Sequence, residues 1–427
     1  VGADLEMVET TLPFGLRVIA VARSTVPTVE MRLRIPFAGS DRLHAARAEL
    51  VASALLTGTE RRSRVEIDDE LASIGGELGA SVDPERLVIA GNALASGLPT
   101  LLEVLADVVT SAAFPAADFE RERDRLAERI AMARSQPRTV AREALQQRRY
   151  GDHPVSREMP LVPDVVAVTA DAARELHRSA TLPTGSTMVL VGDLDPEATV
   201  ALVGEALAGW DRSGRAAELP ALPSLTGRDL LLVDRPGAVQ SQLRLSAESI
   251  SRTDPRYPAM QLANLVFGGY FSSRLVENLR EDKGYTYSAS SYLEFNPSGA
   301  TLLVDTDVTR EVTAAAVLET RYELARLSAV APTEAEIDSA RNYAIGSLLI
   351  SLDSQPGLAG MLTALAGVGL DAEWLRGHPA RLEAVTAEQV AQVAAELFTP
   401  TVFTGVVVGD AAVTAASLRA LGGIELP

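Results

Sequence analysis

The chain contains an internal repeat, and this repeat constrains its fold more than any other feature. Residues 168–193 read VTADAARELHRSATLPTGSTMVLVGD, and residues 385–410 read VTAEQVAQVAAELFTPTVFTGVVVGD. The shared "VTA" and the shared "VGD" are both displaced by 217 positions, from 168 to 385 and from 191 to 408. Each copy reads as a helix, a turn with proline, a β-branched strand and a Gly-Asp turn. The repeat predicts two similar halves.

The front ends of these halves match more loosely. GLRVIAVARSTVPTVEMRLRIPFAG at 15–39 parallels DLLLVDRPGAVQSQLRLSAES at 229–249, since each reads as a strand, a turn and an alternating strand. Between the halves, SGRAAELPALPSLTG has the proline, glycine and serine typical of a linker. We therefore predict an N-terminal half at 1–212, a linker at 213–224 and a C-terminal half at 225–427.

The order of elements within a half indicates the fold class. In the first half, the segments 48–59, 97–114 and 117–137 read as helices after the initial strands. Runs of strands followed by clustered helices are typical of α+β proteins. We expect each half to be a mostly antiparallel sheet with helices on one face.

Composition excludes several classes of function. The formal net charge of −18 argues against a nucleic-acid partner, because nucleic-acid binding requires a basic face. The absence of cysteine excludes disulfides, thiolate metal sites and cysteine nucleophiles. No apolar run approaches the roughly 20 residues of a membrane span, so no membrane partner is expected. The start, VGADLEM, lacks the regions of a signal peptide, and we expect a cytoplasmic protein.

The stretch FGGYFSSRLVENLREDKGYTYSASS at 267–291 has the strongest chemical interest. Ser272 or Ser273 is placed to cap a short helix, on which Leu275 and Leu279 form a buried stripe. Gly284 supplies the left-handed residue that ends the helix. A strand is predicted to follow directly, with its tyrosines on one face.

Arg280 and Tyr287 are the candidate catalytic residues of this stretch. The helix end holds Arg280, the strand start holds Tyr287, and the turn between them can aim both side chains at one point. A cation and a phenol can bind a peptide carbonyl and stabilise the oxyanion formed when water attacks it, which is worth about 3 kcal/mol per donor. The alternative is that Arg280 pairs with Glu277 or Glu281 and that Tyr287 only packs.

This stretch, the two-half length and YGDHPVSR at 150–157 resemble the pitrilysin and mitochondrial processing peptidase family of inverzincin zinc metallopeptidases. The resemblance covers essentially the whole chain and implies the fold of that family in both halves. It also implies that Arg280 and Tyr287 act from the second half toward a zinc ion across a closed chamber. Gly268 and Gly269 would then let the backbone pass close to the peptide substrate.

The resemblance breaks at the metal site. Active members carry His-x-x-Glu-His on a first-half helix and a further Glu on a later helix. Counting back from the Gly58-Thr59 pair places Glu49, Ala52 and Ser53 at the positions of the His-x-x-Glu-His motif.

The later helix also departs from the family pattern. Arg129 falls at the third ligand, or Glu128 if the alignment shifts by one residue, while Glu122 retains a supporting acid. The four histidines, His44, His153, His177 and His378, include no pair four or five residues apart. Each histidine is expected to be structural or solvent-facing, and the chain is expected to bind no catalytic zinc.

The sequence therefore predicts a subunit that is not a peptidase alone. In the bacterial two-subunit enzymes of the resembled family, one subunit has the zinc motif and the other has the Arg/Tyr pair. We expect this chain to be the second kind, with no cofactor of its own, paired with a homologous zinc-binding subunit to cleave unfolded peptides. Two alternatives are an inert structural or scaffold protein and a homodimeric peptide-binding protein.

Overall fold

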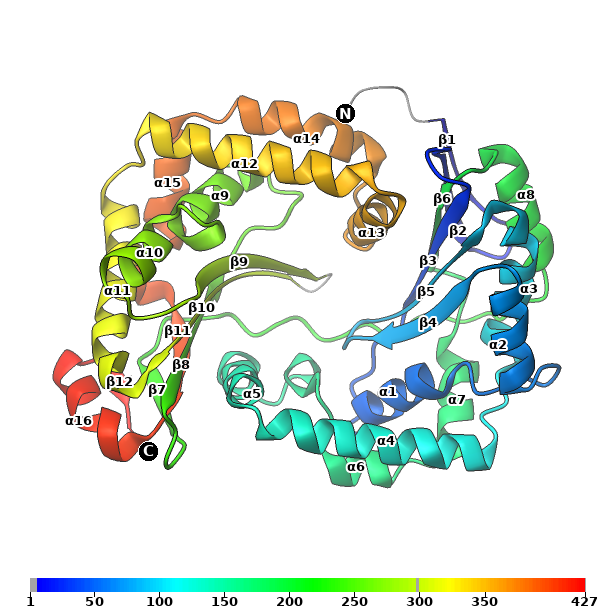
Figure 1. The fold of residues 1–427 in the computed structure, drawn as a ribbon, viewed down its shortest axis with the longest axis horizontal. Helices are drawn as coiled ribbons and strands as arrows, with labels where there is room; N and C mark the ends of the chain where they lie inside the picture. The colour runs from blue at the N-terminus through cyan, green and yellow to red at the C-terminus, as the bar shows by residue number, and fades with distance from the viewer. Residues whose placement is uncertain (1–5, 297–298, 427) are drawn as a thin grey trace. The chain divides into compact units, whose positions relative to one another are not determined.

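The computed structural model describes residues 6–296 and 299–426, which form two compact units. The first unit holds the described residues of 1–132 together with 157–220 and 349–372. The second holds 133–156, 221–348 and the described residues of 373–427. Figure 1 labels the helices and strands of both units.

The first unit is built on a six-stranded sheet in the order β1-β2-β6-β3-β5-β4. Only the β2–β6 pair is parallel among the described pairs of this sheet, so the predicted antiparallel character is confirmed. Apolar side chains alternate along β3, where Val29, Met31, Leu33 and Ile35 enter the core. The strands are β1 Met7–Thr11, β2 Arg17–Ala22, β3 Thr28–Pro36, β4 Glu77–Val82, β5 Arg86–Leu94 and β6 Thr187–Gly192.

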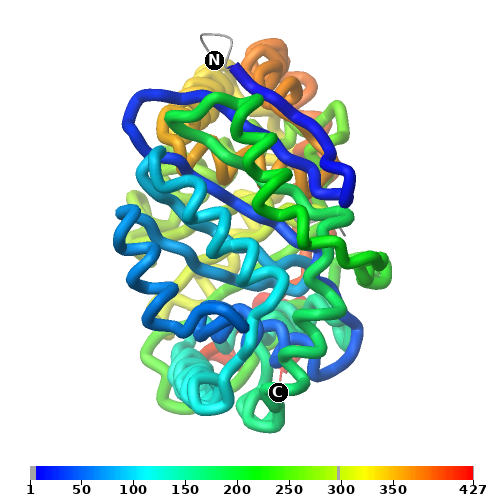
Figure 2. The backbone as a smooth tube through the Cα atoms, turned by 90° about the vertical axis from the view of Figure 1, so that its right-hand side faces the viewer, coloured from blue at the N-terminus to red at the C-terminus, as the bar shows by residue number. Residues whose placement is uncertain are grey.

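Most helices of the first unit pack on the apolar face of its sheet, and Figure 2 looks toward this side of the molecule. The three helices expected from the sequence are present as α1, α3 and α4. The helices are α1 His44–Ala54, α2 Arg64–Ser73, α3 Leu98–Ser111, α4 Ala116–Ser135, α6 Val162–Val166, α7 Ala170–Ala180, α8 Pro196–Ala206 and α13 Gln355–Ala366, with short η1 Ala95–Gly97 and η2 Pro154–Arg157.

The second unit repeats this plan with the order β12-β7-β11-β8-β10-β9. Its β12–β7 and β7–β11 pairs are parallel and its other described pairs are antiparallel. Strand β9 pairs only with β10 and forms one edge of the sheet. The strands are β7 Leu230–Asp234, β8 Gln240–Glu248, β9 Ala289–Asn296, β10 Gly299–Thr309, β11 Thr404–Gly409 and β12 Ile424–Glu425.

The helices of the second unit include two π-helical turns, η3 and η4, which flank the short helix α10. Turn η4 lies inside the stretch 267–291 that the sequence singled out, and η3 overlaps its start. In proteins, π turns are frequent at functional sites. The elements are α5 Pro137–Tyr150, α9 Tyr257–Asn264, η3 Leu265–Gly269, α10 Arg274–Val276, η4 Glu277–Asp282, η5 Arg310–Val312, α11 Thr313–Ala329, α12 Glu334–Asp353, α14 Ala372–Glu383, α15 Ala387–Leu397, η6 Pro400–Val402 and α16 Ala411–Leu421.

The sequence repeat corresponds to equivalent elements of the two units. Helix α7 and strand β6 reappear as α15 and β11, with each boundary displaced by the same 217 positions that separate 168 from 385. Strand β6 lies between β2 and β3, and β11 lies between β7 and β8. The α+β class with two similar halves is therefore confirmed.

Each unit also includes a helix from the other half of the sequence. Helix α5 packs on β8 and β11 of the second sheet, where Ala141 and Leu145 join a small apolar cluster with Leu303, Val406 and Val408 (Figure 1). Helix α13 packs on β3 and β6 of the first sheet. The predicted boundaries at 212 and 225 divide the sequence at the repeat and do not anticipate that α5 and α13 belong to the other unit. They remain a prediction.

Candidate functional site

The loop before β9 carries Tyr287. The structure corrects the predicted strand start, because β9 begins at Ala289 and leaves Tyr285 and Tyr287 in the connecting loop. The hydroxyl of Thr286 donates a hydrogen bond of 2.6 Å to the carbonyl of Asp307 and accepts one of 3.0 Å from the amide of Ser288. These bonds hold the loop against β10 while the neighbouring phenol extends outward.

The short helix before this loop agrees in part with the prediction. Leu275 and Leu279 are fully buried, as the stripe predicted. Gly284 has a φ of +62°, the left-handed conformation expected after the helix. The prediction of side-chain capping is wrong: Ser273 precedes α10, yet its hydroxyl makes no capping bond and is buried without a partner.

Arg280 and Tyr287 are both accessible to solvent. The side chain of Arg280 is 39% exposed, and its Nε lies 3.3 Å from Oε1 of Glu281. Its guanidinium carbon lies 4.9 Å from the ring centre of Phe271. Tyr287 is 97% exposed, which contradicts the alternative that it only packs. Within the described ranges no hydrogen bond joins Arg280 to Tyr287, so their convergence on one point stays a prediction.

The backbone on the N-terminal side of Arg280 is anchored by polar contacts at two positions. The Asn278 amide donates hydrogen bonds of 2.9 Å to Glu319 and 2.8 Å to Glu323, both on α11. Arg274 donates a pair of bonds of 2.6 and 3.0 Å to the carboxylate of Glu336 on α12. These bonds lower the pKa of Glu336 to about 2. The segment is therefore held to two long helices, which fixes the base of the Arg280 side chain.

Gly268 and Gly269 pack against their own unit. A β-carbon at Gly268 would lie 2.8 Å from the hydroxyl of Ser291, and one at Gly269 would lie 2.8 Å from the amide nitrogen of Asn264. Ser291 in turn donates a 2.7 Å hydrogen bond to Asn264. Close packing of η3 on β9 thus accounts for glycine at position 268, and close packing on Asn264 of α9 favours glycine at 269. Their substrate-binding role remains a prediction.

The positions aligned with the metal site lie on α1 and α4 of the first unit. Glu49, Ala52 and Ser53 are on α1, and Nη2 of Arg129 on α4 lies 3.5 Å from the Ser53 hydroxyl. Burial raises the pKa of the Glu49 carboxyl, and the charge of Arg129 lowers it in part. The residues identified from the sequence are therefore neighbours in space, with Arg129 rather than Glu128 facing Ser53.

These residues do not fit a zinc ion. The Ala52 methyl offers no lone pair, and the Arg129 guanidinium is a permanent cation without an acceptor atom. Glu122 is engaged by Arg64 at 3.2 Å and by Arg125 at 2.9 Å. Over residues 6–296 and 299–426, no three His, Cys, Asp or Glu side chains are grouped as metal ligands.

The four histidines all make local structural contacts. Burial lowers the pKa of His177 to about 4 and that of His378 to about 4, so both are neutral at physiological pH. The ring contacts are His44 Nε2 to Phe37 O at 2.7 Å, His153 Nδ1 to the Val155 amide at 3.2 Å, His177 Nε2 to Val108 O at 3.0 Å and His378 Nε2 to Gln261 Oε1 at 2.8 Å. None is placed as a metal ligand.

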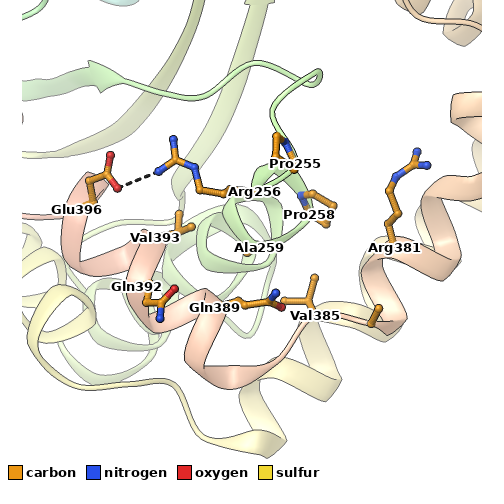
Figure 3. A pocket seen from close by; sticks show the side chains of 11 residues that line it. Pro255, Arg256, Pro258, Ala259, Arg381, Val385, Gln389, Gln392, Val393 and Glu396 are labelled. Atoms are coloured by element: carbon orange, nitrogen blue, oxygen red, sulfur yellow. Dashed lines mark hydrogen bonds and ion pairs between the residues drawn. The ribbon is translucent and has the colours of Figure 1, made fainter.

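Two further features were not visible in the sequence. The first is the contact of Phe271 with Arg280. The second is a pocket of about 430 Å³ in the second unit, between α9, α14 and α15 (Figure 3). Its rim includes an ion pair of 3.0 Å between Arg256 and Glu396. The pocket residues come from 255–259 and 381–396, which are too far apart in sequence for a motif to reveal them.

The fold defines a class: a two-unit protein of the inverzincin metallopeptidase type, with no group of metal ligands among the residues that the structure describes. Residues 45–160 match the family model for insulinase (peptidase family M16). Residues 167–343 match the model for the peptidase M16 inactive domain. The chain therefore belongs to peptidase family M16, the pitrilysin family, and is of its non-catalytic type.

Individual proteins show the same likeness. An uncharacterized zinc protease of Streptomyces coelicolor is 28% identical over 294 residues, which is 66% of this chain and 63%, less than two thirds, of that relative. An uncharacterized zinc protease of Mycobacterium tuberculosis is 29% identical over 354 residues, covering 81% of this chain and 80% of its own. The crystal structure of a peptidase M16 inactive domain from Pseudomonas fluorescens superposes with a TM-score of 0.87 at 21% identity, covering 95% and 98% of the two chains.

Proposed function

We propose that this chain is the non-catalytic subunit of a heterodimeric zinc endopeptidase that cleaves unfolded peptides. One observation carries the proposal: the second unit presents Arg280 and Tyr287 to solvent. It is supported by the first unit, where Arg129 and Ser53, the residues predicted from the family resemblance to replace metal ligands, lie 3.5 Å apart. A homologous zinc-bearing chain is the partner. The zinc proteases among the relatives and the M16 family membership support a peptidase-type partner.

The chemistry assigned to this chain is hydrogen-bond donation. Zinc held by the partner would supply Lewis acidity and an activated water. The terminal N–H groups of Arg280 donate to the carbonyl oxygen of the scissile peptide. The phenol of Tyr287 donates to the same oxygen as it becomes an oxyanion. Both residues act as hydrogen-bond donors, so the contribution of this chain is to lower the barrier of the step.

The substrate proposed is an extended peptide that adds as a strand to an edge of a sheet in the partner. Gly268 and Gly269 are proposed to line the path of this peptide in this chain.

No cofactor is proposed for this chain itself. No helix in the described ranges is long and apolar enough to cross a membrane. The cytoplasmic location remains a prediction from the sequence.

A second candidate function is a catalytically inert scaffold or peptide-binding member of the family. The ion pair of Arg280 with Glu281 favours it, because that pair satisfies part of the guanidinium without a substrate. The accessible Tyr287 favours the first function, since a scaffold has no need of an almost fully exposed phenol.

Coexpression with a zinc-bearing M16 chain tests the proposal. The pair is expected to cleave a quenched fluorescent peptide and to contain one zinc, whereas the isolated chain does neither. Arg280→Ala in the pair is expected to leave the zinc content unchanged and to lower kcat by about 100-fold. Peptide cleavage or stoichiometric zinc in the isolated chain contradicts the proposal, and so does unchanged turnover of the Arg280→Ala pair.

A further inference from the structure

Phe271 is an exposed aromatic residue that the core does not use. It follows η3 and is 62% exposed, and it belongs to neither of the two large buried clusters. Its neighbour Tyr270 behaves differently, because the Tyr270 ring packs at 5.2 Å from the ring of Tyr343 on α12. The contact that the structure gives Phe271 is with the guanidinium of Arg280. Packing in the core therefore does not account for an aromatic residue at this position, and the contact with Arg280 is the observation that carries the argument.

The guanidinium of Arg280 contacts Phe271 and Glu281, and its two terminal nitrogens remain accessible. Its face lies over the Phe271 ring, with 4.9 Å between the guanidinium carbon and the ring centre. Its Nε points to Glu281 at 3.3 Å. Neither terminal nitrogen makes a hydrogen bond to another described residue, so both Nη groups remain available as donors. The buried Leu279 and the anchored Asn278 fix the backbone on its N-terminal side.

We propose that Phe271 is a positioning residue that keeps Arg280 in the conformation in which its terminal N–H groups reach a peptide carbonyl. This inference rests on the proposed function. An arginine side chain has many rotamers, and ordering it in the transition state reduces the gain from its hydrogen bonds. The Phe271 ring beneath the guanidinium restricts the rotamers of Arg280 before the substrate binds, so less conformational entropy is lost in the transition state. Phe271 itself touches no reacting atom and acts only through Arg280.

The ring, rather than the carboxylate of Glu281, is assigned the larger share of this ordering. Glu281 is 55% exposed in its side chain, and exposed ion pairs are weak and screened by salt. The contact of a guanidinium with an aromatic ring is directional, because the attraction requires the guanidinium to lie over the face of the ring. An aliphatic side chain of similar volume at 271 would keep the contact area and lose the electrostatic attraction.

The test uses the pair of this chain with its zinc-bearing partner and one quenched fluorescent peptide that the pair cleaves. Phe271→Leu is expected to lower kcat and kcat/KM equally, by about two- to fivefold, which is the population change that an exposed cation–π contact supports. Phe271→Tyr retains the ring and is expected to keep wild-type turnover. Tyr322→Leu on α11, where the tyrosine is 55% exposed, serves as a matched control and should be silent.

Epistasis decides between positioning and a separate contribution. In an Arg280→Ala background, Phe271→Leu is expected to have no further effect, because the group it orients is gone. If Arg280→Ala itself is silent, the proposed function fails. If Arg280→Ala is slow but Phe271→Leu matches the wild type, or is equally harmful in both backgrounds, this inference is overturned and the proposed function stands. Thermal unfolding of each variant checks that the fold is intact.

Discussion

Nη2 of Arg129 on α4 lies 3.5 Å from the hydroxyl of Ser53 on α1, and both residues occupy positions that the sequence predicts to be degenerate metal positions. Glu49 lies one turn before Ser53 and is affected by the charge of Arg129. Helices α1 and α4 therefore bring the predicted metal positions together in space, and the side chains at these positions differ from the expected zinc ligands. We therefore expect α1 and α4 to position zinc ligands correctly if such ligands are introduced at these residues.

Restoring the ligands is expected to restore metal binding in the isolated chain. The variant Glu49→His, Ala52→Glu, Ser53→His, Arg129→Glu should bind about one zinc per chain and unfold at a higher temperature with zinc than without it. The triple variant that keeps Arg129 is the control, and its remaining cation should weaken binding severely. Zinc content by mass spectrometry is the measurement. No binding by the fourfold variant would show that the alignment of these helices is wrong.

Tyr287→Phe is expected to slow the assembled peptidase without altering assembly or stability. The phenol is 97% exposed, so removing its hydroxyl costs the fold nothing measurable. If it donates to the oxyanion, kcat should fall by about 10- to 100-fold with KM nearly constant. Tyr322→Phe provides the matched loss of an exposed hydroxyl. Steady-state kinetics on one peptide checks both, and equal rates for the two variants would remove Tyr287 from the mechanism.

Stability is expected to decline as the pH falls from 6.5 toward 4. His177 and His378 have pKa values of about 4 in the folded chain, against 6.5 for an unperturbed histidine. The unfolded chain therefore takes up protons in this window and the folded chain does not, so stability present above pH 6.5 is lost as the pH approaches 4. Urea midpoints at pH 7 and pH 5 measure the change. His177→Gln should reduce the difference between the two midpoints, and an undiminished difference would assign the loss to other groups.

Glu336→Gln is expected to destabilise the second unit by about 2 kcal/mol. The change weakens a two-bond contact to Arg274, whose side chain is only 5% exposed, and leaves that cation without its counter-charge. The figure is below that of a fully buried pair because Glu336 is itself 29% exposed. Glu175→Gln is the control, since Glu175 pairs with Arg178 on an open helix face and should cost less than about 0.5 kcal/mol. Urea unfolding followed by circular dichroism compares them.

Gly268→Ala is expected to destabilise the chain by about 1 to 3 kcal/mol even without a substrate. Its new methyl group would lie 2.8 Å from the Ser291 hydroxyl and 3.1 Å from the backbone nitrogen of that residue, which cannot move freely. Gly346→Ala on α12 meets no atom within 4 Å and should be neutral or slightly stabilising. Thermal unfolding of the isolated chain is the measurement. A silent Gly268→Ala would leave room for a purely functional glycine.

The sequence was sufficient for the architecture because the repeat and the apolar alternation are local. The shared ends at 168–193 and 385–410 predicted a helix and a strand in each half, and α7, β6, α15 and β11 are those elements. The buried pair Leu275 and Leu279 and the left-handed Gly284 followed from spacing and residue type alone.

The predictions for Tyr287, Ser273 and Phe271 failed or were missed because tertiary packing, rather than the local sequence pattern, decides the structure there. Tyr287 was placed on a strand because its neighbours alternate, but the bond of Thr286 to the carbonyl of Asp307 keeps that segment in a loop. Ser273 has a capping residue type, yet its hydroxyl is buried without a partner. The packing of Phe271 under Arg280 connects residues nine positions apart across α10 and the start of the π turn η4, which no periodic pattern anticipates.

The exchange of α5 and α13 has a consequence for the order in which the protein is made. The first sheet receives α13 only after residue 355 has been synthesised, although its last strand is complete at residue 192. The face of the first sheet on which α13 packs is therefore uncovered while most of the second half is synthesised. Cutting the gene between the repeats would produce two polypeptides, the first without α13 and the second without α5. Each unit can therefore be completed only when both halves of the sequence are present.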